Sequence, residues 1–206
     1  MTPGGLTLLR QIQLALEAFY RLDPAPCVTD FLVDPSQPRR GREQLLILEE
    51  QDLFLGLALD PALPEALHNG RLEPGNLQEF CLLVEGVSHY LCVVFCVRQE
   101  RPVSVMELEL QAEVDKYVAC ALLAARAPDL TLERLHGMLY DGFELVAGLD
   151  PIERLRYLLA NYLARRYTRA LERVLAARVG WAAVLTELRR FYRLAYQGKQ
   201  QLIDRR

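Results

Sequence analysis

The sequence predicts a mainly α-helical protein with one small β-hairpin. Apolar residues recur at helical spacing through most of the chain, whereas the stretch from Gln44 to Leu59 shows the two-residue period of strands. Helix-start signals precede two of the apolar segments. The chain has 206 residues, 51% of them hydrophobic, which is enough to bury a core. We therefore expect a helical bundle with a long C-terminal helical hairpin.

The N-terminal part is expected to form one helix followed by the β-hairpin. Residues 6–22 place Leu9, Ile12 and Leu16 on one helical face, and the prolines of Asp23-Pro24-Ala25-Pro26 end that helix. In the predicted hairpin, Leu45–Leu48 and Leu53–Leu59 flank a polar turn over residues 49–52. Residues 27–33 are expected to form a short strand. Residues 34–42 and 60–75, which are rich in proline and glycine, are expected to be loops.

The middle of the chain allows two interpretations. In the first, residues 76–98 and 104–125 form two helices joined over Gln99–Val103. Heptad-like apolar spacing and a capping box, Ser104 with Glu107, favour this interpretation. In the second, the first helix is broken at Gly86, and Tyr90–Val97 with Val103–Leu110 form another hairpin, because Tyr, Val, Phe and Cys suit strands. The second interpretation gives an α+β sheet in residues 26–110 with helices packed on it.

Under the second interpretation, the first 126 residues run helix, strand, hairpin, helix, hairpin, helix. This order is similar to that of the small acidic chaperones of bacterial type III secretion. The resemblance implies a dimeric protein that holds a segment of a partner protein.

The C-terminal third is expected to be helical. A helix is predicted around residues 131–145, and Asp150-Pro151-Ile152-Glu153 is a strong start for a second, running to about Ala177. Val179-Gly180 should end this long helix, and residues 181–203 should form its partner.

Charge divides the chain into two expected parts. Residues 1–149 carry 11 Lys and Arg against 22 Asp and Glu, a net charge of −11, whereas residues 150–206 carry 13 against 5, a net charge of +8. We therefore expect an acidic α+β body, residues 1–149, and a basic helical hairpin, residues 150–206, packed on the body or on a partner.

The basic hairpin presents arginines at helical spacing. They form the expected partner or nucleic-acid surface: Arg165, Arg166, Arg169, Arg173, Arg189, Arg190 and Arg193. Such stripes can neutralise phosphates, and interleaved tyrosines can stack on bases. However, the acidic body would repel a phosphate backbone, and 22 of the 24 cationic residues are Arg along the whole chain. Docking on protein is therefore favoured over nucleic acid.

The helical interpretation of the middle brings four metal-binding side chains together. Glu85 and His89 share one face at i and i+4, as do Glu109 and Glu113 on the returning helix. Carboxylates and an imidazole facing one another inside a bundle are typical of metal sites. The alternative is a buried polar network in which Glu85 pairs with Lys116 and His89 bonds to Glu113. Asp115 beside Lys116 is expected to be a surface pair unless these helices are unusually buried.

The sequence points away from several other function classes. The five cysteines form no C-x-x-C pair, and no Gly-rich phosphate loop or nucleophile–base pair is present, so we expect no cofactor and no catalytic residue. The longest central apolar run is too short for a membrane span. We expect a cytoplasmic, non-enzymatic interaction, scaffold or chaperone-like protein that self-associates. A nucleic-acid-binding module and a metal-dependent enzyme are the alternatives.

Overall fold

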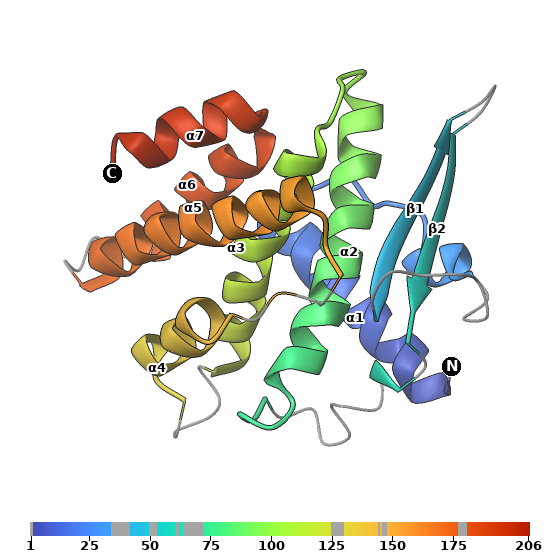
Figure 1. Ribbon diagram of the computed structural model, residues 1–206, viewed down its shortest axis with the longest axis horizontal. Helices are drawn as coiled ribbons and strands as arrows, with labels where there is room; N and C mark the ends of the chain where they lie inside the picture. Colours follow the sequence, from blue (N-terminus) through green and yellow to red (C-terminus); the bar gives the residue numbers. More distant parts are fainter. Residues whose placement is uncertain are drawn as a thin grey trace.

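In the computed structural model, two long antiparallel helices, α2 (Leu77–Arg98) and α3 (Val105–Ala124), lie at the centre of the fold (Figure 1). The structure describes residues 2–33, 42–49, 53–60, 62–63, 72–124, 130–143, 145, 148–176 and 181–206. The β-hairpin packs on α2 on one side, and α5 packs on α3 on the other. The fold is thus mainly α with a small β-hairpin, as the sequence predicts.

The remaining elements surround this central pair. In chain order they are α1 (Pro3–Tyr20), the 3-10 turn η1 (Val28–Phe31), β1 (Glu43–Glu49), β2 (Leu53–Leu59), α4 (Leu132–His136), the π-helical turn η3 (Gly137–Asp141), α5 (Pro151–Ala176), α6 (Trp181–Arg193) and α7 (Tyr196–Asp204). The predicted loop residues 34–41 and 64–71, the turn residues 50–52 and the predicted break at Val179-Gly180 lie outside the described residues.

The helical interpretation of the middle is confirmed, and the interpretation with a sheet in residues 26–110 is wrong. Ser104 Oγ accepts the N–H of Glu107 at 3.1 Å, which caps α3 as predicted. The residues that suggested strands, including Tyr90 and Val93, are buried in the core helix α2. Their apolar character reflects burial on every side, which a core helix and a central strand share. The element order that resembles the secretion chaperones is therefore not present.

The hairpin lies close to α2 because of a glycine. β1 and β2 pair antiparallel, with Leu45 opposite Leu57. Gly86 lies in the middle of α2 and does not break it. A Cβ added there would be 2.9 Å from Leu57 Cδ1 and 3.1 Å from Glu43 Cγ, so only glycine lets the hairpin approach this closely.

Buried polar side chains of α1 hold the extended segment that follows it. Gln13 Oε1 accepts the N–H of Val28 at 2.8 Å, and Glu17 Oε1 accepts the N–H of Ala25 at 2.9 Å. The predicted strand over 27–33 is thereby replaced by η1 and a single bridge from Leu32 to Leu57. These bonds satisfy backbone groups that would otherwise be buried without partners.

The C-terminal helices share one core with the rest of the chain. Tyr192 of α6 stacks on Tyr20 of α1 with ring centroids 4.4 Å apart, and Tyr167 of α5 stacks on Phe191 at 4.2 Å. The start predicted for α5 is confirmed, because Asp150 Oδ1 accepts the N–H groups of residues 152 and 153.

Two predicted helices are shorter than expected. The helix predicted over 131–145 ends at Asp141, and the helix predicted over 181–203 is interrupted at residues 194–195. Ala195 there has an extended backbone, with ψ of 165°, and starts α7. The C-terminal segment therefore consists of three helices where the sequence predicts a hairpin of two.

Among the described residues, only α2 has the length and composition of a membrane span. Its most apolar 18 residues have a mean hydropathy of 2.0, and 72% of them are buried inside the protein. They pack against α1, α3 and the hairpin, which accounts for their apolar character as a core helix.

We expect Gly86→Val to lower the free energy of unfolding by about 1–3 kcal/mol, because the new side chain would push the hairpin off α2. Denaturant unfolding would measure this. Gly75→Ala is the matched control, since a Cβ at Gly75 meets no atom within 4 Å. Equal stability of the Gly86→Val variant and the wild type would contradict this account of the packing.

Candidate functional site

The central helix pair buries an unusual number of polar and charged side chains. Eight of them have less than a tenth of their surface exposed: Ser88, His89, Glu107, Glu109, Gln111, Glu113, Asp115 and Lys116. Charged residues are rarely buried unless they are paired. They fall into two groups, which we call the His89 centre and the Asp115 network.

The His89 centre lies where β1, α2, α3 and α5 meet. Its members are Glu43, Glu85, His89, Glu109, Glu113, Lys116 and Arg156. His89 Nδ1 lies 3.7 Å from Glu43 Oε1, and His89 Nε2 lies 3.7 Å from Glu109 Oε2. Lys116 Nζ lies 3.1 Å from Glu85 Oε2 and 2.5 Å from Glu113 Oε1. Arg156 Nε lies 3.4 Å from Glu109 Oε1. The centre thus joins four carboxyl groups to three groups that can carry positive charge.

Burial and neighbouring charge act together on the pKa values in this centre. Burial raises the pKa of Glu109 to about 7 and also raises the pKa of Glu43. Burial acts in the same direction on Glu85, but the Lys116 ammonium outweighs it and lowers the pKa of that carboxyl. Burial alone would lower the pKa of His89, but the surrounding carboxylates, Glu43 first, outweigh burial and raise it to about 9. The centre therefore favours positive charge between its carboxylates.

The structure brings three of the four predicted metal-site residues into direct proximity. Glu109 Oε2 lies 3.7 Å from His89 Nε2, and a Glu85 donor atom lies within 4.8 Å of one from His89. Lys116 holds both Glu85 and Glu113, and Glu113 lies away from the imidazole. The predicted pairing of Glu85 with Lys116 is present, but Glu109, and not Glu113, faces His89.

Sequence reasoning missed two members of the centre, Arg156 and Glu43, of which Glu43 lies beside His89 Nδ1. Glu43 is the first residue of β1, and its donor atom lies within 4.8 Å of those of Glu85 and His89. Its only signal in the sequence is a charge at the edge of an apolar strand, which is ordinary for strand ends.

The Asp115 network corrects the expectation of a surface pair, because Asp115 is only 1% exposed. Asp115 Oδ1 accepts from the Tyr20 hydroxyl at 2.5 Å and from Gln111 Nε2 at 2.8 Å. Asp115 Oδ2 accepts from the Ser88 hydroxyl at 2.5 Å. Gln111 Oε1 in turn accepts from Lys199 Nζ at 2.7 Å. The network links α1, α2, α3 and α7 through hydrogen bonds that are shielded from water.

Lys199 brings a fully buried ammonium from α7 to this network. Its Nζ lies 3.7 Å from Glu107 Oε1 and 5.2 Å from the ring centroid of Phe191. Burial lowers the pKa of Lys199. Glu107 also pairs with Arg101, whose guanidinium lies 2.6 Å from Glu107 Oε1. A buried ion pair therefore fixes the last helix to the centre of the fold.

The five cysteines form no disulfide bond in the structure. All five are free, and the thiols of Cys81 and Cys120 lie 3.8 Å apart across α2 and α3. Donor atoms of Cys92, Cys96 and Glu107 lie within 4.8 Å of one another. Burial raises the pKa of Cys120, which keeps that thiol protonated and unreactive.

The predicted arginines of α5 pair with nearby carboxylates. Arg165 lies 2.6 Å from Asp141, Arg166 lies 3.2 Å from Asp204, and Arg169 lies 2.9 Å from Glu172. Arg173 is exposed, and its Nε donates to the carbonyl of Arg169 at 3.4 Å.

Two predicted arginines of α6 bind the end of α1. Arg189 Nε donates to the carbonyl of Phe19 at 2.9 Å, and Arg193 donates to the carbonyls of Tyr20 and Arg21 at 3.0 Å. These are terminal carbonyls of a helix, where the helix dipole concentrates negative charge. Arg190 is exposed to solvent.

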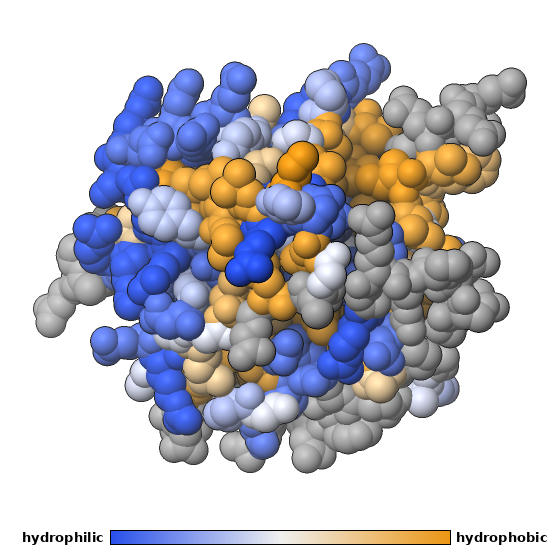
Figure 2. Space-filling view, in the orientation of Figure 1, coloured by the Kyte–Doolittle hydropathy of each residue, from blue (hydrophilic) through white to orange (hydrophobic). Residues whose placement is uncertain are grey.

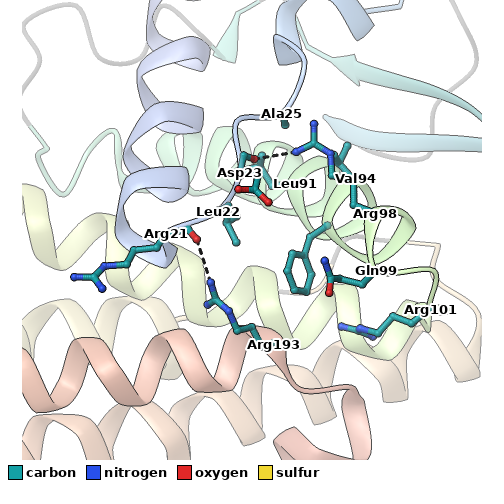
Figure 3. A pocket seen from close by; sticks show the side chains of 11 residues that line it. Arg21, Leu22, Asp23, Ala25, Leu91, Val94, Arg98, Gln99, Arg101 and Arg193 are labelled. Atoms are coloured by element: carbon teal, nitrogen blue, oxygen red, sulfur yellow. Dashed lines mark hydrogen bonds between the residues drawn. The ribbon is translucent and has the colours of Figure 1, made fainter.

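A pocket of about 460 Å³ opens beside these bonds (Figure 3). Four arginines line it: Arg21, Arg98, Arg101 and Arg193. Arg98 donates to the carbonyl of Asp23, Arg193 donates to that of Arg21, and Arg101 is held by Glu107. Figure 3 shows the Arg21 side chain pointing away from the cavity. The guanidinium groups here join α1, α2, α3 and α6 to one another.

The first half of α5 exposes a row of large apolar side chains, which we call the α5 face. Ile152 is 77% exposed, Leu155 66%, Leu158 45%, Leu159 37% and Tyr162 54%. In Figure 2, hydrophobic surface lies near the centre, where the first half of α5 runs, and hydrophilic surface lies to the left over its second half. On the same side of the helix, the 3-4 spacing of the row continues into Arg166, Arg169 and Arg173.

We expect Asp115→Ala to lower the free energy of unfolding by about 3–5 kcal/mol, because three buried donors would lose their acceptor. Asp115→Asn should lower it far less, since its carbonyl can still accept and the Ser88 hydroxyl can accept from its amide. Chemical denaturation of both variants would measure the difference. Similar losses for Ala and Asn would show that charge, and not hydrogen bonding, sets the role of Asp115.

Comparison of the chain with protein-family models, with curated proteins and with solved structures finds no match.

Proposed function

We propose that the protein is a non-enzymatic interaction protein that self-associates through the α5 face. The observation that carries this proposal is the row of five large apolar side chains on one helix, each at least 37% exposed. Single exposed apolar residues are common on protein surfaces, but a contiguous apolar patch with a polar rim marks an interaction site.

The spacing of the α5 face suits a second copy of the same chain. Ile152, Leu155, Leu159 and Tyr162 follow one another at intervals of three, four and three residues, the pattern by which two helices pack side by side. In an antiparallel pair centred near residue 157, Ile152 would face Tyr162 of the second copy, and Leu155 would face Leu159. Such an arrangement is two-fold symmetric and closes as a dimer.

The charges at the two ends of the face support the antiparallel arrangement. Asp150 and Glu153 stand at the start of α5, and Arg165 and Arg166 follow the apolar row. In the antiparallel pair, the arginines of one copy come level with the acidic start of the other. A parallel pair would instead bring arginine against arginine along the second half of the helix.

The proposal extends to a cytoplasmic location. Its support is the odd set of five cysteines, four of them buried, which is typical of reduced thiols in a core and not of a disulfide frame. Two exposed arginines, Arg173 and Arg190, leave nucleic acid as the alternative partner.

We expect the wild-type chain to form a dimer and the double variant Leu155→Glu, Leu159→Glu to be monomeric. Each glutamate would place a charge in the apolar interface, which should weaken association at least 100-fold. Sedimentation equilibrium over a range of protein concentrations would measure both association constants. Both side chains are exposed in the single chain, so its fold should be retained.

Leu14→Glu is the matched control, because Leu14 is a 47% exposed leucine on α1, outside the α5 face. It should dimerise like the wild type. A wild-type chain that stays monomeric even when its concentration is raised about 100-fold above that of an ordinary assay would refute self-association. Retention on heparin that is lost in an Arg173→Glu, Arg190→Glu variant would favour the nucleic-acid alternative instead.

A further inference from the structure

We propose that Glu43, Glu85 and His89 bind one divalent transition-metal ion, and that Glu109 positions the imidazole from its other nitrogen. One donor atom from each of the three ligands lies within 4.8 Å of the other two. This inference is independent of self-association, since all four residues belong to one chain.

The distances fit two ligands of one ion better than a hydrogen bond. His89 Nδ1 and Glu43 Oε1 are 3.7 Å apart, which is too far for a hydrogen bond. Nitrogen and oxygen ligands lie about 2.0–2.2 Å from a bound zinc ion, so two of them on one ion are separated by about 3–4 Å. The gap between the two side chains therefore has the width that an ion requires.

Unpartnered buried atoms point to the same place. Glu43 Oε1 is buried and has no hydrogen-bond partner, and its side chain is only 6% exposed. His89 Nε2 is also buried without a partner and faces Glu109 Oε2 at 3.7 Å. Leaving such atoms unsatisfied is unfavourable, and an ion on the Nδ1 side would satisfy the first atom directly. Glu109 lies on the side of the ring opposite Nδ1, which is the side from which a carboxylate usually orients a metal-bound histidine.

The charges of the His89 centre balance when an ion is bound. Its four carboxylates, contributed by Glu43, Glu85, Glu109 and Glu113, face the cations Lys116 and Arg156. A divalent ion with a neutral imidazole brings the net charge of the centre to zero. Without the ion, the centre reaches the same balance only when its imidazole and one of its carboxyl groups both hold a proton.

The ligand set indicates the class of metal. One imidazole and two carboxylates suit Zn²⁺, Mn²⁺ or Fe²⁺, whereas Mg²⁺ and Ca²⁺ prefer oxygen ligands alone. Three protein ligands leave a coordination position for water. The ion would also join β1 to α2, and the close approach that this needs depends on Gly86, where a Cβ would lie 3.2 Å from Glu43 Oε1.

The test is metal binding by the full chain after treatment with chelator. Titration with Zn²⁺ or Mn²⁺ alone, followed by calorimetry, should give one equivalent bound, and the melting temperature should rise by several degrees. Glu43→Gln should weaken binding at least 30-fold and remove the rise in melting temperature. Glu113→Gln should weaken binding much less than Glu43→Gln, because it removes a charge from the His89 centre but no ligand.

X-ray absorption at the zinc edge distinguishes zinc bound at this site from zinc bound by the thiols of Cys92 and Cys96. The proposal requires nitrogen and oxygen neighbours at about 2.0–2.2 Å, and sulfur at about 2.3 Å would overturn it. Less than a tenth of an equivalent bound by folded wild type would overturn it as well, as would undiminished binding by Glu43→Gln. The comparison between the Glu43→Gln and Glu113→Gln variants stands even if a His89→Gln variant fails to fold.

Discussion

The burial of four carboxylates on α3 is the constraint on which the rest of the fold depends. Glu107, Glu109, Glu113 and Asp115 are all less than a tenth exposed, although they lie on different sides of the helix. A buried carboxylate without a partner is strongly unfavourable, so each needs one. Lys116 of α3 itself is the partner of Glu113, and neighbouring elements contribute partners to the other three. Tyr20 comes from α1, His89 from α2, Arg156 from α5 and Lys199 from α7. The elements are arranged around α3 in the way that these pairings demand.

This constraint gives a physical meaning to the division of charge along the chain. The basic C-terminal segment supplies Arg156 and Lys199 to buried carboxylates, and Arg189 and Arg193 to the carbonyl end of α1. Much of its positive charge is therefore bonded to groups of the same molecule. At the surface, α5 is apolar in its first half and cationic in its second half. This is the surface to which we propose that a second copy of the chain binds.

The sequence could predict the parts of the fold that depend on local signals. The helix pair follows from apolar spacing and the Ser104 cap, and the start of α5 from Asp150 and Pro151. The i, i+4 pair of Glu85 and His89 also follows from local spacing. Glu43 could not be predicted, because its place beside His89 depends on how the hairpin packs over Gly86. The burial of Asp115 was missed because a charged residue is ordinarily taken to face solvent, and its burial becomes stable through the hydroxyls of Tyr20 and Ser88 and the amide of Gln111.

The two lysines of the chain have a consequence for its chemistry. Lys116 is 9% exposed, Lys199 is fully buried, and both ammonium groups are held by carboxylates or amide oxygens. The folded surface therefore presents its positive charge as guanidinium, with almost no lysine amine. Reagents or enzymes that acylate lysine side chains would reach them readily only in molecules that have opened, so lysine acylation would report the population of open molecules.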